Sequence, residues 1–248
     1  MQKKVIIAID GPAGSGKSTV SRLVAKKLGL LYLDTGAMYR ALTLKAMRDN
    51  LDLKDTKALI NMAKDTKIDI ETKPHMCAIN VFLDGKDVTD KIRTPELTEN
   101  IKYVARVPGV RKCMVKMQRQ IGAQKGIVLE GRDTTTVVFP DAPYKFYLDA
   151  SITERAKRRF KELRDLGMKT SLKEVKADAQ RRDISDKRRK IGALKIAKDA
   201  IYIDTTKMSV EEVVNRILDE IMPKGKIQGI NSLVSRRISR KVAKFGNK

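Results

Sequence analysis

The segment Val5-Ile6-Ile7-Ala8-Ile9-Asp10 runs directly into Gly11-Pro12-Ala13-Gly14-Ser15-Gly16-Lys17-Ser18, and this stretch decides the fold. The first part predicts a buried strand, and the second matches the pattern Gly-x-x-x-x-Gly-Lys-Ser. Its glycines let successive backbone N–H groups turn toward one phosphate group. Apolar residues at helical spacing follow, so a helix N-terminus adds its dipole to the anion site. The stretch therefore predicts a phosphate-binding loop for a nucleoside triphosphate.

Two side chains of this loop have defined chemical roles. Lys17 reaches the β- and γ-phosphates, and the hydroxyl of Ser18 is a ligand for Mg²⁺. The loop does not indicate which molecule receives the phosphoryl group, or whether the triphosphate only drives a switch. The residues expected to hold the triphosphate here are Gly11, Pro12, Ala13, Gly14, Ser15, Gly16, Lys17, Ser18 and Thr19.

Composition limits the class of protein. The chain has 248 residues, enough for one domain with appended subdomains. No apolar run approaches the roughly 18 residues that a membrane-spanning helix needs. The first strand starts too early for a signal peptide, and the two cysteines lack a disulfide or metal-binding pattern, so a cytoplasmic chain is expected. The single histidine, His75, argues against a histidine-ligated metal or a serine–histidine triad.

The formal net charge of +23 is high, and residues 223–248 supply +8 of it from eight Lys or Arg residues and no acid. Apolar residues from Ile227 to Val242 recur at helical spacing in this tail and predict a basic amphipathic helix. Three interpretations stay open: the tail docks on the core or a partner subunit, is disordered, or binds RNA or a membrane. The charge attracts polyanions, but a generally basic, solvated surface explains it equally well.

Apolar, β-rich runs alternate with stretches of helical spacing. Continuous apolar strands separated by helices predict an α/β fold in three layers, with a parallel sheet covered on both faces. The expected strands are 5–10, 30–33, 127–130, 145–148 and 200–203, and the expected helices are 17–28, 36–49, 56–65, 95–104, 108–122, 151–166, 171–184 and 209–221.

Two segments interrupt the alternation. Residues 67–93 contain short strand patterns at 68–72 and 78–83 and an Asp84-Gly85 turn, which predict an antiparallel β insertion. Residues 152–192 are helical and rich in arginine. They include an Arg-Arg-Asp-x-x-Asp-x-x-Arg pattern that a solvated helix face does not require.

An anionic phosphoryl acceptor needs several arginines that converge on one gap, and a lid that excludes water. Suitable arginines occur in four places, two of them at ends of predicted strands, where open α/β sheets bind ligands. Each alone is explained by an ordinary surface ion pair, but their joint placement favours an acceptor site. The four places are 32–40, 109–111, 130–133 and 182–189.

At these residues the chain resembles the bacterial-type cytidylate kinases, which are nucleoside monophosphate kinases with a P-loop core. The resemblance runs from residue 3 to about residue 221, and the 84–89 and 131–142 strings are specific to this family among monophosphate kinases. Besides the loop, it rests on Leu33-Asp34-Thr35-Gly36-Ala37-Met38-Tyr39-Arg40, Asp84-Gly85-Lys86-Asp87-Val88-Thr89, Glu130-Gly131-Arg132-Asp133, Thr136-Val137-Val138-Phe139-Pro140-Asp141-Ala142, Leu148-Asp149-Ala150-Ser151 and Ile203-Asp204-Thr205-Thr206.

The resemblance implies phosphoryl transfer from ATP to CMP, and to dCMP, by a monomeric, Mg²⁺-dependent enzyme of pyrimidine nucleotide metabolism. The domain it implies covers residues 1–222 and precedes the basic tail 223–248. Its parts are a core (1–35, 105–150 and 193–222), an antiparallel β-containing monophosphate-binding insertion (36–104) and a helical lid (151–192).

The resemblance also implies roles for individual residues. Arg40 and Arg132 face the acceptor phosphate, Arg182 and Asp186 the sugar, and Arg111 and Asp133 the base. The full implied set is Thr35, Arg40, Arg111, Arg132, Asp133, Arg182, Asp186 and Arg189 at the acceptor, Arg155 and Arg159 over the triphosphate, and Lys17, Arg132 and Arg189 as catalytic residues.

The chain departs from the family pattern in three places. Thr134-Thr135 replaces an apolar residue and a glycine, and β-branched residues resist a positive φ, so the geometry beside Asp133 is in question. Lys102 replaces a small hydroxyl residue near the base. Gly192-Ala193-Leu194 replaces Ser-Pro-Leu, which is expected to loosen the exit from the lid.

Other functions stay open at this point. A UMP, AMP or shikimate kinase shares the loop and the lid, but is expected to lack the 84–89 and 131–133 strings. A basic RNA-associated protein that only holds a nucleotide is favoured by the tail, whereas the complete phosphate-binding set argues against it. A switch GTPase needs an Asn-Lys-x-Asp motif, which this sequence does not contain.

Overall fold

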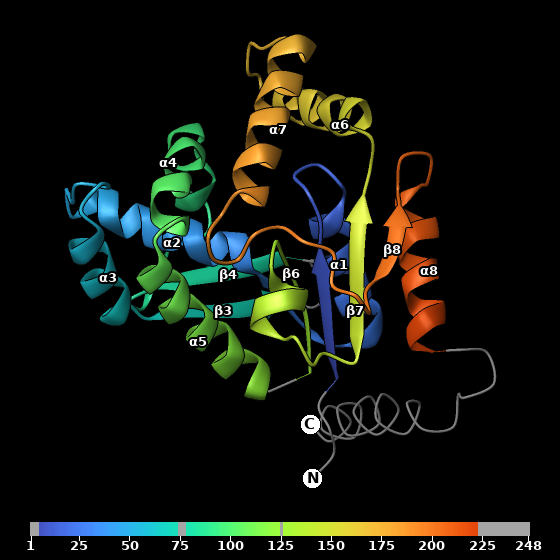
Figure 1. Ribbon diagram of the computed structural model, residues 1–248, viewed down its shortest axis with the longest axis horizontal. Coiled ribbons are helices and arrows are strands. Elements are labelled where there is room, and N and C mark those ends of the chain that lie inside the picture. The colour runs from blue at the N-terminus through green and yellow to red at the C-terminus, as the bar shows by residue number, and fades with distance from the viewer. Residues whose placement is uncertain (1–4, 74–77, 125, 223–248) are drawn as a thin grey trace, which may run out of the picture.

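The computed structural model describes residues 5–73, 78–124 and 126–222. Its central sheet confirms the predicted α/β fold, because all four strand pairings are parallel. The strands are, in order across the sheet, β2 (Leu31–Asp34), β6 (Ile127–Gly131), β1 (Ile6–Asp10), β7 (Tyr144–Asp149) and β8 (Ile201–Asp204) (Figure 1).

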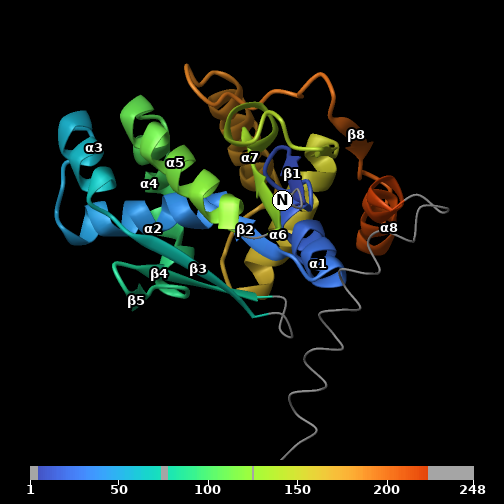
Figure 2. The same cartoon turned by 90° about the horizontal axis from the view of Figure 1, so that it is seen from below.

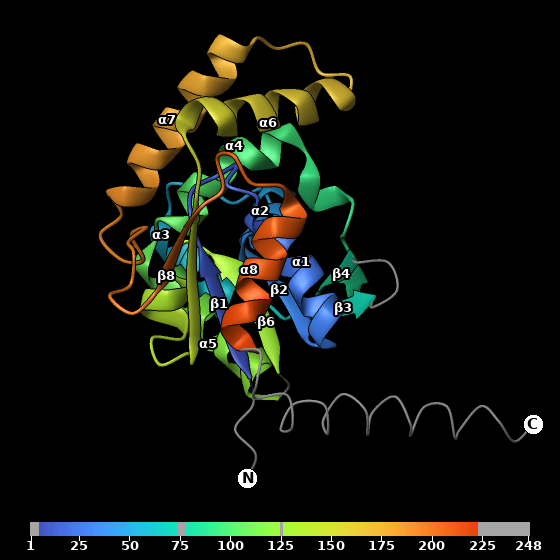
Figure 3. The same ribbon diagram turned by 90° about the vertical axis from the view of Figure 1, so that its right-hand side faces the viewer.

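The centre of this sheet is the most buried part of the fold. Ile7, Ala8 and Ile9 of β1 have no exposed surface, and β6 beside it is buried along its whole length. Continuous burial requires cover on both faces. One face carries α1 (Lys17–Leu28) and α8 (Val210–Ile221), which pack on each other, and the opposite face carries α5 (Pro108–Gln124) (Figure 3).

Between β2 and α5 the chain builds the segment expected to be an insertion. Its second sheet is antiparallel, as predicted, and the Asp84-Gly85 turn leads into a third short strand that the sequence pattern did not predict (Figure 2). Both turn residues have positive φ, 49° and 80°, as a type I′ hairpin turn requires. The elements are α2 (Thr35–Arg48), α3 (Thr56–Lys64), β3 (Ile68–Lys73), β4 (Ala78–Leu83), β5 (Lys86–Asp87), the 3₁₀ turn η1 (Lys91–Arg93) and α4 (Pro95–Ala105).

The arginine-rich segment forms two helices, α6 (Ile152–Asp165) and α7 (Leu172–Lys187), which pack on each other above the carboxyl end of β7 (Figures 1 and 3). Serine caps explain where they begin. Ser151 accepts a hydrogen bond from the backbone of the third helical residue of α6, and Ser171 forms a capping box with Glu174 of α7. The helix α7 extends three residues beyond the predicted end at 184, so its last turn carries Asp186.

A π-helical turn, η2 (Thr134–Val138), lies in the connection between β6 and β7. The sequence pattern did not predict this turn. Such turns are rare and frequently occur at functional sites. No helix in the described part of the chain is long and apolar enough to cross a membrane. The amphipathic helix expected at 223–248 lies outside the described residues.

Candidate active site

The phosphate-binding loop connects β1 to α1 at the carboxyl edge of the sheet. Gly11 packs so closely on β7 that an added Cβ would lie 2.0 Å from the carbonyl oxygen of Leu148. Gly16, the N-cap of α1, has φ of 87° and no side chain that caps the helix. The first N–H groups of α1 are therefore open to an anion. The Ser15 hydroxyl beside them is buried and has no hydrogen-bond partner among the described residues.

Lys17 is almost completely buried at the start of α1. Its Nζ donates to the carbonyl oxygen of Pro12 at 2.8 Å, which folds the side chain back over the loop. Burial, followed by the positive charge of Arg132, lowers the pKa of Lys17 to about 8. Negatively charged phosphate groups at this point would favour the protonated ammonium and so compensate for its burial and for the charge of Arg132. The site therefore suits a polyanion.

Ser18 and Glu130 place a hydroxyl and a carboxyl group side by side next to the loop. The Ser18 hydroxyl donates to Oε1 of Glu130 at 2.6 Å, and the Tyr32 hydroxyl donates to the same oxygen at 3.2 Å. Burial, and then the nearby charge of Asp34, raises the pKa of Glu130. A hydroxyl and a buried carboxylate are the kind of hard ligands that suit Mg²⁺, and a cation here would favour the ionised carboxylate. These residues fit the expected cofactor.

The two threonines after Asp133 bind the carboxylate of Asp10. Thr134 donates to Oδ1 and Thr135 to Oδ2, each from its backbone nitrogen and its hydroxyl, over 2.6–2.9 Å. Neither threonine has a positive φ, because both lie in the π-helical turn. The strain expected at this departure from the family pattern is therefore not present.

Arg111 of α5 and Asp133 form a buried ion pair through Nη2 and Oδ2. Nη1 of Arg111 donates to the carbonyl oxygen of Ala105 at 3.1 Å, whereas its Nε has no partner among the described residues. The guanidinium lies over the ring of Tyr39, 5.4 Å from its centroid. Burial is the main cause that raises the pKa of Tyr39 to about 12. The two groups expected to face the base are thus together.

Asp186 connects the core to the lid. Its Oδ2 accepts from Nε of Arg132 at 2.7 Å, and its Oδ1 accepts from Arg189. Burial favours the neutral acid, but the charges of Arg132 and Arg189 outweigh it and hold the pKa of Asp186 below its usual value. Two arginines that a phosphate can bind are therefore fixed at the end of β6.

Thr35 and Arg40 of α2 also lie at this edge of the sheet. Thr35 donates its hydroxyl to the carbonyl oxygen of Glu130 at 2.7 Å. Nη2 of Arg40 donates to Oδ2 of Asp34 at 2.8 Å, while its buried Nε has no partner among the described residues. Asp34 also caps α2, so one carboxylate starts the helix and holds Arg40 at the sheet edge.

Two of the arginines expected in the site pair within their own helices instead. Arg182 bonds Asp178 of α7 at 2.7 Å, and Arg159 bonds Glu162 of α6 at 2.8 Å. Lys102, the departure expected near the base, is exposed, and its Nζ lies 5.1 Å from the ring centroid of Tyr103. The structure does not bring these three side chains into the cluster.

Other lid arginines do reach the loop. Nη1 of Arg155 donates to the carbonyl oxygen of Ala13 at 3.1 Å, and its guanidinium forms a two-pronged ion pair with Asp183 of α7. Arg158 donates to the carbonyl oxygen of Thr205 at 2.7 Å. Its Nη1 is 3.8 Å from where a Cβ on Gly16 would stand. Arg158 therefore lies beside the loop in the place expected for Arg159.

The exit from the lid is tightly packed rather than loosened. Gly192 is buried, has φ of 69°, and lies directly on the ion pair of the base site. A Cβ added to it would be 2.1 Å from Nη2 of Arg111 and 2.4 Å from Oδ2 of Asp133. Leu194 is also buried, and its backbone donates to the carbonyl oxygen of Asp186 at 2.9 Å. Only glycine fits at 192 without a shift of these groups.

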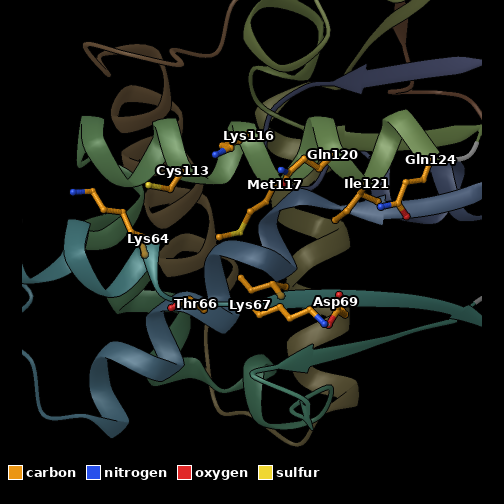
Figure 4. Close-up of a pocket in the computed structure, with 12 residues that line it drawn as sticks. Lys64, Thr66, Lys67, Asp69, Cys113, Lys116, Met117, Gln120, Ile121 and Gln124 are labelled. Atoms are coloured by element: carbon orange, nitrogen blue, oxygen red, sulfur yellow. The ribbon is translucent and has the colours of Figure 1, made fainter.

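A groove of about 460 Å³ lies elsewhere, between α5 and the segment that contains α3 and β3 (Figure 4). Its lining combines apolar side chains with Lys64, Lys67 and Lys116. None of the sequence-predicted site residues lines it. We therefore place the site on the network of hydrogen bonds and ion pairs at the carboxyl edge of the central sheet.

Sequence reasoning assigned no role to Asp10, Glu130, Tyr39 or Arg158. Asp10 is the last residue of β1, and Glu130 is the residue before the last of β6, the neighbouring strand. A charged residue near the end of an apolar strand is a signal for both, but that β1 and β6 are neighbours becomes visible only once the strand order is known. The contacts of Tyr39 and Arg158 depend on packing that no local pattern encodes.

Known proteins resemble this chain along most of its length. The cytidylate kinase family model matches residues 7–223. The cytidylate kinase of Caldanaerobacter subterraneus is 46% identical over 88% of this chain and 94% of its own. That of Desulforamulus reducens is 48% identical over 88% and 97%, and that of Limosilactobacillus reuteri 49% identical over 88% and 95%. The chain belongs to the cytidylate kinase family.

Proposed function

We propose that this chain transfers the γ-phosphoryl group of ATP to CMP and releases ADP and CDP. The observation that carries the proposal is the position of the Arg111–Asp133 pair. It lies at the same sheet edge as a complete phosphate-binding loop, and Asp133 is followed directly by the residues that bind Asp10. The relatives named cytidylate kinase support the same acceptor.

The transfer needs no general base. An oxygen of the CMP phosphate, already deprotonated at neutral pH, forms a bond to the γ-phosphorus while the bond to the β-phosphate oxygen breaks. Catalysis is then positioning and neutralisation of charge. Lys17 holds the β- and γ-phosphates, and Arg132 and Arg189 bind the acceptor phosphate and the group in transit.

The finer assignment of the cofactor is part of the proposal. Ser18 and Glu130 would hold Mg²⁺, directly or through water. When bound, the ion would neutralise part of the negative charge of the triphosphate. The Tyr32 hydroxyl, bonded to Glu130 at 3.2 Å, orients that carboxylate.

Selection of the base follows from hydrogen-bond chemistry. Cytosine offers an N4 amino donor beside the N3 and O2 acceptors. The Asp133 carboxylate accepts from N4, and the Arg111 guanidinium donates to N3 or O2. Uracil places an oxygen where N4 was, which costs about 1–3 kcal/mol. UMP is therefore expected to be phosphorylated with a lower kcat/KM than CMP, but still at a measurable rate.

The sugar contacts set the expectation for the deoxynucleotide. Asp186, which the family resemblance assigns to the sugar, is held between Arg132 and Arg189, whereas Arg182 pairs with Asp178. We propose that the ribose is held mainly at its 3′ edge, so that dCMP is accepted as well. Absence of dCMP turnover at millimolar concentration would contradict this.

A coupled assay of ADP release with CMP, dCMP, UMP and AMP tests the function. We expect the highest kcat/KM with CMP or dCMP, a lower value with UMP, and none above background with AMP. A preference for AMP or UMP would overturn the acceptor assignment.

We also propose that the enzyme is monomeric and that the 223–248 tail takes no part in catalysis. The family match ends at residue 223. Light scattering gives the oligomeric state, and deletion of 223–248 is expected to leave kcat/KM for CMP unchanged. RNA affinity that falls steeply with salt and vanishes on this deletion would assign a polyanion-binding role to the tail.

A further inference from the structure

The carboxylate of Asp10 is the point at which the two halves of the site are connected. Asp10 is the last residue of β1, directly before the phosphate-binding loop, and has no exposed surface. Its Oδ1 accepts from the backbone nitrogen of Thr134 at 2.9 Å and from its hydroxyl at 2.8 Å. Its Oδ2 accepts from the nitrogen of Thr135 at 2.8 Å and from its hydroxyl at 2.6 Å. We call this group the Asp10–threonine clamp.

The two hydroxyl bonds are additional to what the backbone provides. An apolar residue and a glycine at 134 and 135 would keep the two N–H bonds and lose both hydroxyl bonds. Burial raises the pKa of Asp10, and the hydrogen bonds from Thr134 and Thr135 oppose this rise because they favour the ionised carboxylate. Both threonines are buried, so water does not replace a missing hydroxyl. The side chains thus double the hydrogen bonds to this carboxylate.

The clamp acts mainly on the acceptor side. The phosphate-binding loop is also held by two other hydrogen bonds, from Lys17 to the carbonyl oxygen of Pro12 and from Arg155 to that of Ala13. β1 itself is paired on both edges. The segment that carries Arg132 and Asp133 has left β6 and has no strand partner. Its side chains pair with Arg111 and Asp186, and its first backbone hydrogen bond to the central sheet after β6 runs from Thr134 to Asp10 at 2.9 Å.

We propose that Thr134 and Thr135 are positioning residues whose hydroxyls, through Asp10, hold Arg132 and Asp133 at the distance from the phosphate-binding loop that in-line transfer requires. This inference rests on the proposed function, because the distance matters only if an acceptor binds at Arg132 and Asp133. Misplacement of reacting groups by about 1 Å can cost on the order of 100-fold in rate.

Valine tests the hydroxyls because it keeps the branched shape of threonine and removes the donor. The variant Thr134→Val/Thr135→Val is compared with Thr134→Ser/Thr135→Ser, which restores both hydroxyls. Thr136→Val is the matched control, since it lies in the same turn and no hydrogen bond of its side chain is found among the described residues. The measurements are kcat and KM for CMP, the Kd of ATP alone, and thermal unfolding.

We expect the double valine variant to lose about tenfold in kcat/KM for CMP while its Kd for ATP stays within about twofold. The serine variant is expected to recover most of the loss, and Thr136→Val to match the unaltered enzyme. A loss below fivefold, an equal loss of ATP affinity, or failure of the serine variant to recover would overturn the inference. If the double variant does not fold, Thr135→Val alone is measured in the same way. It is expected to lose less in kcat/KM for CMP, again with an unchanged Kd for ATP.

Amide hydrogen exchange separates this inference from the proposed function. The clamp predicts faster exchange at residues 131–138 in the double valine variant and unchanged exchange at 11–18, whatever the acceptor is. Equal rates at 131–138 in variant and unaltered enzyme would overturn the clamp. Lack of CMP turnover by the unaltered enzyme would overturn the function and leave the exchange result standing.

Discussion

The two halves of the site are built in opposite ways. The donor half is one contiguous stretch that presents backbone N–H groups, with Lys17 as its main charged side chain. The acceptor half is assembled from side chains on α2, α5, the end of β6 and α7, which hold one another through ion pairs. The donor half therefore depends on backbone shape, whereas the acceptor half depends on charge partners from distant segments.

This difference has an energetic consequence. The Arg111–Asp133 pair is almost fully buried, and ions removed from water must be compensated by partners with good geometry. Changing one partner leaves the other charge buried and unpaired. We therefore expect substrate specificity, rather than triphosphate binding, to be the property most sensitive to mutation outside the loop.

The largest effect is expected on the donor half, at the buried ammonium of Lys17. Lys17→Met removes a preorganised charge at the transferred phosphoryl group, and such groups contribute about 2.7–4 kcal/mol, or 10²–10³-fold in kcat. Lys27→Met, at an exposed position on the same helix, is the control and should not change the rate. Near-normal turnover by a folded Lys17→Met enzyme would contradict the mechanism.

A substitution at Gly192 tests the packing of the acceptor half. Gly192→Ala combines a positive φ with a clash against Arg111 and Asp133, and such strain costs about 1–3 kcal/mol. We expect KM for CMP to rise by about tenfold or more, with little change in KM for ATP.

The matched control is Gly167→Ala, which has φ of 75° but open space around the added Cβ. It carries the backbone strain without the clash and should leave KM for CMP within about twofold. An equal rise in KM for CMP in both variants would mean that only the positive φ of Gly192 matters, and not the clash with Arg111 and Asp133.

The pH dependence distinguishes the free donor half from the loaded one. Lys17 must be protonated to bind phosphates, and its pKa of about 8 is below the usual 10.5. As pH rises through 8 the free enzyme loses this charge, so kcat/KM for ATP is expected to fall by about tenfold per pH unit above 8. Bound phosphates favour the ammonium, so kcat should decline only at higher pH. A kcat/KM for ATP that stays constant up to pH 10 would show that the pKa of Lys17 in the free enzyme is not lowered to about 8.

The smallest expected effect separates two neighbouring arginines of the lid. Arg158 lies beside Gly16, whereas Arg159 pairs with Glu162. Arg158→Ala should raise KM for ATP several-fold, and Arg159→Ala should leave it within about twofold, as an exposed ion pair contributes little. The reverse order would mean that the lid rearranges when ATP binds.

The two halves also differ in how far the sequence predicts them. The donor loop is contiguous, so its motif specifies both its shape and its chemistry. Arg111, Asp133 and Asp186 follow from the family resemblance, but their pairing needs the fold. Arg158 and Arg159 are one residue apart, and a helix turns about 100° per residue, so a family-level assignment misses which one faces the loop.

Thr134 and Thr135 show most clearly what local sequence does not predict about the site. Their β-branched side chains predict strain wherever glycine is usual. The π-helical turn places both at negative φ and aims both hydroxyls at Asp10. Nothing within the local sequence indicates that turn, because its stabilising acceptor is more than a hundred residues away.

The central claim is that the Arg111–Asp133 pair reads the base, and Asp133→Asn tests it most directly. The amide keeps the shape of the carboxylate and gains a donor that suits the O4 of uracil. The measurement is the ratio of kcat/KM for CMP to that for UMP, with Asp141→Asn at an exposed position as control. We predict that the ratio falls by about 10–100-fold in the Asp133 variant and stays constant in the control. An unchanged ratio in a folded Asp133→Asn enzyme would contradict the account.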